Sequence, residues 1–275
     1  MYRFGWFSTG RDKAARDLLK AAYDGIKDGD IKAEIAFVFC SREPGESNES
    51  DNFIELVKSY NIPLVCYSYQ KYKAGKKDSP PGEELPEWRL DYDREVMRRL
   101  KDYNVDLCVL AGYMLITGRE MCSYYNMINL HPAAPGGPAG TWQEVIWQLM
   151  QSKAKETGVM MHLVTPELDK GPVVSYCKFS ITGNDYDEQW QKLEGQDISN
   201  IKAIQGSENQ LFRTIRSQGL KREFPLILVT MKAFSRGDVK IMDGRVANAK
   251  DDIINGCDLT GEIENIVKLD HKGGD

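Results

Sequence analysis

The sequence predicts an α/β protein with a Rossmann-like open, mostly parallel twisted sheet and helices on both faces. Short apolar runs alternate with helical patterns over the first two thirds of the chain, which is typical of βαβ units. The hydrophobic fraction of 41% and the charged fraction of 28% are ordinary for a globular protein of 275 residues. The first residues, MYRFGW, enter an apolar strand-like run at once. Together these observations favour a large α/β domain over an all-helical or all-β fold.

Each element is predicted from its own periodicity and its flanking residues. Strands are expected at Arg3–Thr9, Glu34–Cys40, Leu64–Tyr67, Leu107–Ala111, Met127–Leu130, Gly158–Val164 and Val173–Ser180. Helices are expected at Asp12–Lys27, Asn52–Tyr60, Asp91–Tyr103 and Trp142–Met150. Asp51 and Asp91 are placed as helix N-caps or first-turn acids. A polar, lysine-rich stretch at 70–87, with two adjacent prolines, predicts an inserted mobile loop.

The later part of the chain gives a less regular pattern. A helical stretch from Tyr186 is expected to end at Gly219 and to lead into the apolar run Phe224–Thr230. A hairpin is expected around residues 236–238, followed by a strand at Val239–Met242. We find no linker, and therefore predict one catalytic domain at 1–248 and an acidic C-terminal extension at 249–275.

Charge and cysteine usage exclude several classes of protein. A net charge of −5 argues against binding nucleic acid through its phosphates. No run approaches the roughly 18 apolar residues that a membrane span needs, and the start has no signal-peptide pattern, so we expect a cytoplasmic protein without a membrane partner. The six cysteines are scattered without a CxxC pair, which indicates reduced thiols and neither a disulfide framework nor a metal site.

The most informative motif is INLHP at residues 128–132, together with Asp169 in PELDKGP. The Asn129 amide can hydrogen-bond a developing oxyanion, and the His131 imidazole can exchange protons near neutral pH. The Asp169 carboxylate can fix the tautomer of the imidazole. These three groups suffice to move an acyl group onto an amine. With only three histidines in the chain, a histidine between a strand and a Pro/Gly loop points to function.

The end of the first expected strand, STGRDK at residues 8–13, offers a possible anion site. Exposed N–H groups at a helix start attract anions, and Arg11 and Lys13 add positive charge beside Gly10. The alternative is an ordinary strand-to-helix turn, because the GxGxxG fingerprint is absent. The same absence argues against a nicotinamide-dependent oxidoreductase.

Several segments in order resemble the folate-dependent formyltransferases, most closely the phosphoribosylglycinamide (glycinamide ribonucleotide) branch. The resemblance runs from about Phe4 to Ile241. It is strongest in VLAGYM at 109–114, in INLHP, and in GVMMHLVTPELDKGP at 158–172. It is fainter in WRLDYDRE at 88–95 and EFPL at 223–226.

The resemblance implies roles for the matching residues. Asn129, His131 and Asp169 match the catalytic trio, and 10-formyltetrahydrofolate would be the formyl donor, with no metal. The donor pocket would have a first wall at Met114–Thr117 and a second wall at Val164–Asp169. The donor-side residues are Met114, Leu115, Ile116, Thr117, Val164, Thr165, Pro166 and Glu167; the acceptor-side residues are Gly10, Arg11, Lys13, Arg89 and His162. A core histidine is the alternative for His162, and a surface ion pair is the alternative for Arg89.

Three departures from the family fall on the acceptor side. Asp12 stands in the family's phosphate loop, the loop after Pro132 reads AAPGGPAG, and Leu220 stands where a glutamate contacts the acceptor ribose. The resemblance implies a phosphorylated small-molecule amine as acceptor, with glycinamide ribonucleotide of purine biosynthesis the first candidate. The three departures leave other acceptors open. An amino sugar nucleotide as acceptor, hydrolysis of the donor, and folate binding without catalysis remain alternatives. The oligomeric state is not predicted.

Overall fold

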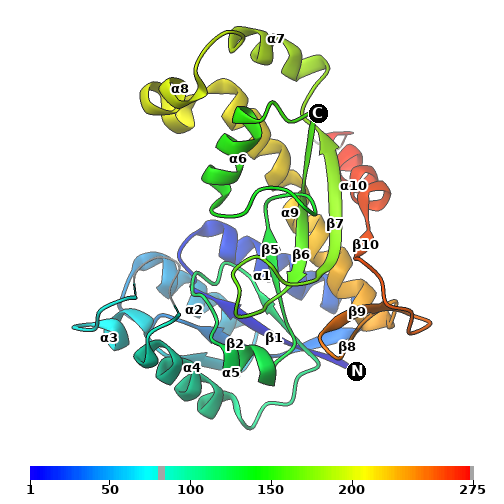
Figure 1. Cartoon of the computed structure of the whole chain (residues 1–275). Coiled ribbons are helices and arrows are strands. Elements are labelled where there is room, and N and C mark those ends of the chain that lie inside the picture. Colours follow the sequence, from blue (N-terminus) through cyan, green and yellow to red (C-terminus); the bar gives the residue numbers. More distant parts are fainter. Residues whose placement is uncertain (80–83, 273–275) are drawn as a thin grey trace.

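A computed structural model describes residues 1–79 and 84–272 (Figure 1). Its centre is an eight-stranded sheet with the order β10-β7-β6-β5-β4-β1-β2-β3. The strands are β1 (Tyr2–Ser8), β2 (Ala33–Cys40), β3 (Leu64–Cys66), β4 (Leu107–Leu110), β5 (Met127–His131), β6 (Glu156–Leu163), β7 (Val173–Ser180) and β10 (Cys257–Asp258). Strand β6 runs antiparallel to β5 and β7, and the other pairs are parallel. The predicted fold class and the seven predicted strands are confirmed.

Helices cover both faces of this sheet. One face is covered by α1 (Lys13–Lys27), α2 (Asn48–Ser59), α9 (Gln210–Arg236) and α10 (Thr260–Lys272), whose buried apolar residues share one core with the strands. The other face is covered by α4 (Glu87–Leu100) and α5 (Arg119–Tyr124). A third cluster joins α6 (Trp142–Gln151), α8 (Ile198–Gln205) and the first half of α9, and Figure 1 shows α7 (Asn184–Lys192) and α8 projecting at the top of the molecule.

The predicted break at Gly219 is wrong, because α9, which is 27 residues long, continues through that residue to Arg236. The buried positions Leu226, Ile227, Thr230, Met231 and Phe234 repeat with helical spacing, so the apolar run that follows Gly219 faces the core as one side of a helix. Pro225 lies inside this helix without ending it. Tertiary packing of the apolar side thus outweighs two local helix breakers.

The predicted hairpin at 236–238 is also wrong, and it lies a few residues further along. Gly237 has a φ of 76° and caps the C-terminus of α9 in the left-handed conformation. The hairpin joins β8 (Val239–Met242) to β9 (Arg245–Asn248) through Asp243 and Gly244, with φ of 49° and 70°. Two consecutive left-handed residues are the requirement of a type I′ turn, which Asp-Gly meets.

The expected loop at 70–87 begins as a helix, α3 (Tyr69–Lys73), capped by the Ser68 side chain. Helix α4 starts at Glu87, so Asp91 lies beyond its first turn, whereas Asp51 is a first-turn acid of α2 as expected. Residues 80–83, which include the expected Pro80-Pro81 pair, lie outside the described residues. Within the described ranges, no helix has the length and apolar character to cross a membrane.

The C-terminal segment contributes to the core. Strand β10 pairs with β7, and α10 packs on α9 and β7, with Leu259, Ile263 and Val267 buried. The division of the chain at residue 248 stays a prediction. The contacts of α10 nevertheless mean that the sheet and α9 lose apolar cover if the segment is removed.

Replacing Ile263 with Ala tests this contribution. Because Ile263 is fully inaccessible, we expect the variant to lose about 2–5 kcal/mol of the free energy of unfolding, measured by urea denaturation. Leu269→Ala, on the exposed side of the same helix, is the matched control and should change stability by less than about 0.5 kcal/mol. Equal effects of the two substitutions would show that α10 does not pack as described.

Candidate active site

Strand periodicity places three of the predicted side chains on one face of the sheet. Asn129 and His131 are two residues apart on β5, and His162 of β6 lies directly opposite Asn129 in the antiparallel register. His131 and His162 are both only 3% exposed. The centroids of the two imidazole rings are 6.2 Å apart. Asn129 and His131, the two residues predicted from INLHP, and the second histidine therefore share one face of the sheet.

Asp169 completes this group from the turn between β6 and β7. Its Oδ2 lies 3.6 Å from His131 Nδ1, and its Oδ1 lies 3.6 Å from His162 Nε2. The residue has a φ of 56°, a left-handed conformation that aspartate tolerates in turns. Gly171 allows the turn to close, because a Cβ there would lie 1.7 Å from the Leu163 carbonyl oxygen. One carboxylate is thus shared by two buried imidazoles.

The shared carboxylate is held in its charged form. Burial alone would raise the pKa of Asp169, but interactions with His162 and His131 and a backbone hydrogen bond from Gly140 outweigh it, so the pKa lies below 3.8. The ionised carboxylate can therefore orient both imidazoles by charge at any pH where the protein would work.

The glycine-rich loop after β5 folds over this group, which sequence reasoning did not anticipate. His131 Nε2 lies 2.9 Å from the Pro138 carbonyl oxygen, and because a carbonyl only accepts, Nε2 carries the hydrogen. The loop ends at Thr141, which forms a capping box with Glu144 at the start of α6. The only sequence signal for these contacts was the unusual loop composition, which specifies flexibility but not contact.

The two predicted donor walls precede β5 and follow β6 in the chain, and both pack against the same buried cluster of apolar residues. Leu115 of the first wall and Val164 of the second pack against the same buried cluster. Three large apolar side chains stay solvent-exposed on these walls: Met114 at 54%, Ile116 at 42% and Leu168 at 56%. Thr165 is tied to its own turn by a hydrogen bond to the Glu167 carbonyl, and Pro166 is exposed. Exposed apolar groups on well-anchored turns are suited to contacting a flat, partly apolar ligand.

The predicted phosphate site at the start of α1 is occupied by the protein itself. Asp12 is the N-cap of the helix and accepts a hydrogen bond from the Ala15 N–H at 3.0 Å. Arg11 pairs with Asp12 at 3.4 Å, and Lys13 pairs with Asp17 at 2.5 Å. Gly10 is left-handed, with a φ of 62°. The roles of Gly10, Arg11 and Lys13 in phosphate binding stay predictions, and Asp12 places a negative charge in that position.

Arg89 lies inside α4, and the surface ion pair offered as its alternative role is wrong. The residue is 3% exposed and its Nη1 bonds Asp93 Oδ1 at 2.5 Å. A contact between Arg89 and the acceptor phosphate stays a prediction. On α9, Leu220 is 40% exposed, whereas Glu223 is buried and pairs with Arg216, so Glu223 is engaged elsewhere than in a ribose contact.

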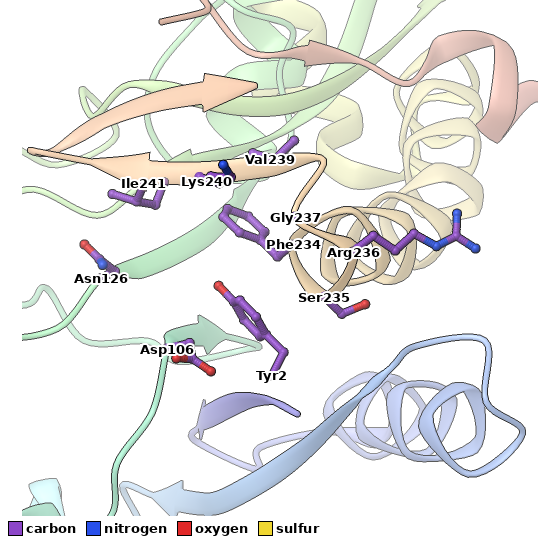
Figure 2. A pocket seen from close by; sticks show the side chains of 10 residues that line it. All are labelled: Tyr2, Asp106, Asn126, Phe234, Ser235, Arg236, Gly237, Val239, Lys240 and Ile241. Atoms are coloured by element: carbon purple, nitrogen blue, oxygen red, sulfur yellow. The ribbon is translucent and has the colours of Figure 1, made fainter. Parts of the chain in front are cut away.

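A cavity of about 400 Å³ lies at the amino ends of the central strands, whereas His131 lies at the carboxyl end of β5 (Figure 2). Tyr2, Asp106 and Asn126 line it at the amino ends of β1, β4 and β5, and the end of α9 and strand β8 close its other side. None of the predicted site residues lines this cavity. In the described part of the chain, no group of three or more His, Cys, Asp or Glu could hold a metal ion.

Replacing Asp169 with Asn tests the electrostatics of the shared carboxylate. A lowered folded-state pKa means that the charge stabilises the protein above pH about 3.8 and that this stabilisation is lost as the pH falls through the lower folded value. We expect the wild type's advantage in the free energy of unfolding over Asp169→Asn to be constant from pH 6 to about 4 and to shrink below it. Urea denaturation across this range, with the exposed Asp238→Asn as baseline, measures the difference. A pH-independent difference would contradict the charged contact.

Comparisons with known proteins agree with this fold. Phosphoribosylglycinamide formyltransferase of Dictyostelium discoideum is 28% identical over 57% of this chain and 74% of its own length. Formyltetrahydrofolate deformylase of Haemophilus influenzae is 24% identical over 66% of this chain and 55% of its own length. The solved phosphoribosylglycinamide formyltransferase of Coxiella burnetii has the same fold, with a TM-score of 0.65 at 19% identity over 94% of this chain and 98% of that chain. The formyl transferase family matches residues 13–197, which is more than half of the chain and includes Asn129, His131 and Asp169, so the predicted resemblance is confirmed and this chain belongs to the formyl transferase family.

Proposed function

We propose that this protein transfers the formyl group of 10-formyltetrahydrofolate to a primary amine, and that the amine is glycinamide ribonucleotide. The observation that carries the proposal is the convergence of the Asn129 amide, the His131 imidazole and the Asp169 carboxylate on one sheet face. The relatives named as phosphoribosylglycinamide formyltransferases support this choice of acceptor. No metal is required, since the oxyanion is stabilised by hydrogen-bond donors.

The donor fits the two walls beside the trio. Met114, Ile116 and Leu168 offer exposed apolar contact, and peptide groups of the walls other than the bonded Met114 N–H and Ile116 carbonyl would meet the polar edges of a heterocycle. The pterin ring is flat and carries polar edges, which matches this combination. The walls would therefore orient the donor with its formyl group toward Asn129 and His131.

The residues of this chain then have separate roles in direct transfer. The Asn129 amide and the Nε2–H of His131, once the latter is released from the Pro138 carbonyl, donate hydrogen bonds to the oxygen that becomes negative when the amine attacks the formyl carbon. Asp169 holds the imidazole and, through a water, passes the proton of the amine to the folate nitrogen that departs. The new bond joins the amine nitrogen to the formyl carbon, and the bond from that carbon to the folate nitrogen breaks.

Release of tetrahydrofolate from 10-formyltetrahydrofolate, followed by absorbance with and without glycinamide ribonucleotide, tests the proposal. We expect release that depends on the acceptor and falls about 10²–10³-fold in Asn129→Ala, because an oxyanion donor is lost. His131→Ala should lose about 10²–10⁴-fold. Asn126→Ala, at an exposed asparagine immediately before β5, is the matched control and should behave as the wild type.

Each of the other outcomes would identify one of the alternative functions. Release without an acceptor at the same rate would indicate a hydrolase, the activity in the name of the deformylase relative. Release only with another amine, such as an amino sugar nucleotide, would replace the acceptor. Tight donor binding without release under any condition would indicate a folate-binding protein without catalysis.

Asp12 provides a second test, directed at the acceptor phosphate. Asp12→Asn keeps a good N-cap and removes one negative charge from the start of α1. If the phosphate binds there, the KM for glycinamide ribonucleotide should fall roughly three- to tenfold, as expected for removing a repulsion of about 1 kcal/mol. Asp24→Asn, near the other end of the same helix, should leave this KM unchanged. An unchanged KM in Asp12→Asn would place the acceptor's anionic group away from α1.

A further inference from the structure

A buried ion pair connects helix α4 to the first donor wall. The side chains of Arg89 and Asp93 are 3% and 2% exposed. Arg89 Nη1 donates to Asp93 Oδ1 at 2.5 Å, and Arg89 Nη2 donates to the Ile116 carbonyl oxygen at 2.5 Å. Asp93 Oδ2 accepts the Gly118 N–H at 2.7 Å. One ion pair thus satisfies a backbone group on each side of Thr117.

The attraction between the two charges alone does not account for such a pair. Removing two charges from water is costly, and apolar residues of similar volume often stabilise a core equally well or better. Apolar residues here would leave the Ile116 carbonyl and the Gly118 N–H without their partners. Unlike apolar residues, the ion pair therefore fixes the position of the backbone from Ile116 to Gly118 through these two hydrogen bonds.

The surroundings limit any movement of this segment. The Arg89 guanidinium lies 5.5 Å from the centroid of the Tyr69 ring and 5.2 Å from that of Tyr92, so both rings restrain it. A Cβ on Gly118 would lie 2.6 Å from a methyl carbon of Leu90. The backbone of the wall thus lies directly against α4.

The other end of the wall is held as well. The Met114 N–H donates to Thr9 Oγ1 at 3.1 Å, and Thr9 Oγ1 accepts the Ser41 hydroxyl at 3.1 Å. Between these fixed ends, Met114 and Ile116 remain exposed. Apolar side chains that stay in solvent on a segment fixed from below form a preorganised surface, which lowers the cost of ordering when a ligand binds.

We propose that Arg89 and Asp93 are positioning residues that fix the first donor wall and thereby set the affinity of the protein for its formyl donor. This inference rests on the proposed function, because the ligand of the wall is the donor named there. It differs from the role that the family resemblance implies for Arg89, which is contact with the acceptor phosphate. The two roles affect different kinetic constants.

Steady-state kinetics with each substrate varied separately tests the proposal in the full-length protein. Asp93→Asn keeps an oxygen for the Gly118 N–H but removes the charge, and Arg89→Met removes the bonds to Ile116 and Asp93 while keeping an unbranched side chain that packs in the same place. We expect the KM for 10-formyltetrahydrofolate to rise about 10–100-fold in Arg89→Met, with the KM for glycinamide ribonucleotide unchanged. Asp93→Asn should show a smaller rise in the same constant.

Two further variants separate positioning from folding. Gly118→Ala is compatible with the local backbone, whose φ is −74°, yet its Cβ would lie 2.6 Å from Leu90 Cδ2 and 2.9 Å from Asp93 Oδ2. The methyl group therefore displaces the wall from α4 while both charged side chains of the ion pair are kept. It should raise the donor KM in the same way. Arg94→Met, on the exposed side of α4 where Arg94 pairs with Glu87 and Glu120, is the matched control and should leave both KM values unchanged.

Amide hydrogen exchange at Gly118 gives a readout that is independent of turnover. The amide should be protected in the wild type and exchange faster in Arg89→Met, and added donor should restore part of the protection in the variant. If donor KM and Gly118 exchange stay at wild-type values while thermal stability falls, the pair is only structural and the proposal is overturned.

The remaining outcomes also decide the question. A rise in the acceptor KM alone would assign Arg89 to the acceptor and overturn the positioning role. If the wild type itself neither binds nor consumes 10-formyltetrahydrofolate, the proposed function fails and the positioning role fails with it. If the wild type turns over normally and the variants match it, only the positioning role fails.

Discussion

The Asp169 carboxylate lies between two imidazoles that solvent barely reaches, and the local fold is arranged to keep it charged there. Its partners are His131 of β5 and His162 of β6. The turn that carries Asp169 must therefore return to the face of the sheet on which these two side chains lie. The reversal of β6 supplies that geometry, because an antiparallel neighbour sets His162 opposite Asn129. A parallel β6 would need a long crossover and would not bring this turn back beside the same strands.

The surroundings of the trio are held from several independent directions. The Thr9 hydroxyl, directly after β1, holds the Met114 end of the first wall, and a buried ion pair on α4 holds its Gly118 end. The loop before α6 contacts His131 through the Pro138 carbonyl oxygen. Backbone groups therefore make much of the site, and side chains far from the substrates determine where those groups lie. Substitutions behind the walls are expected to alter kinetics as clearly as substitutions within them.

The parts of this architecture that depend on local patterns could be predicted from the sequence. The seven strands and the Asn129–His131 spacing follow from apolar runs and a period of two, and the family motif located Asp169. The long helix α9 could not be predicted in this way, since Gly219 and Pro225 suggest a break that core packing overrides. The capping role of Asp12 and the pairing of Arg89 with Asp93 and the wall depend on which groups meet in three dimensions. Composition carries no record of those distances.

The contact between His131 and Pro138 has a consequence for chemistry in the absence of the acceptor. The imidazole Nε2–H already has a hydrogen-bond partner, supplied by a loop whose position next to α6 is fixed by the Thr141 capping box. A water molecule that enters without the acceptor must displace the Pro138 carbonyl before it can hydrogen-bond the His131 Nε2–H. Water makes few other contacts that could offset the loss of that hydrogen bond. Under the proposed function, the larger amine acceptor would offset this loss with its own contacts to the protein. Under the proposed function, this hydrogen bond would therefore favour formyl transfer to the amine over hydrolysis of the donor.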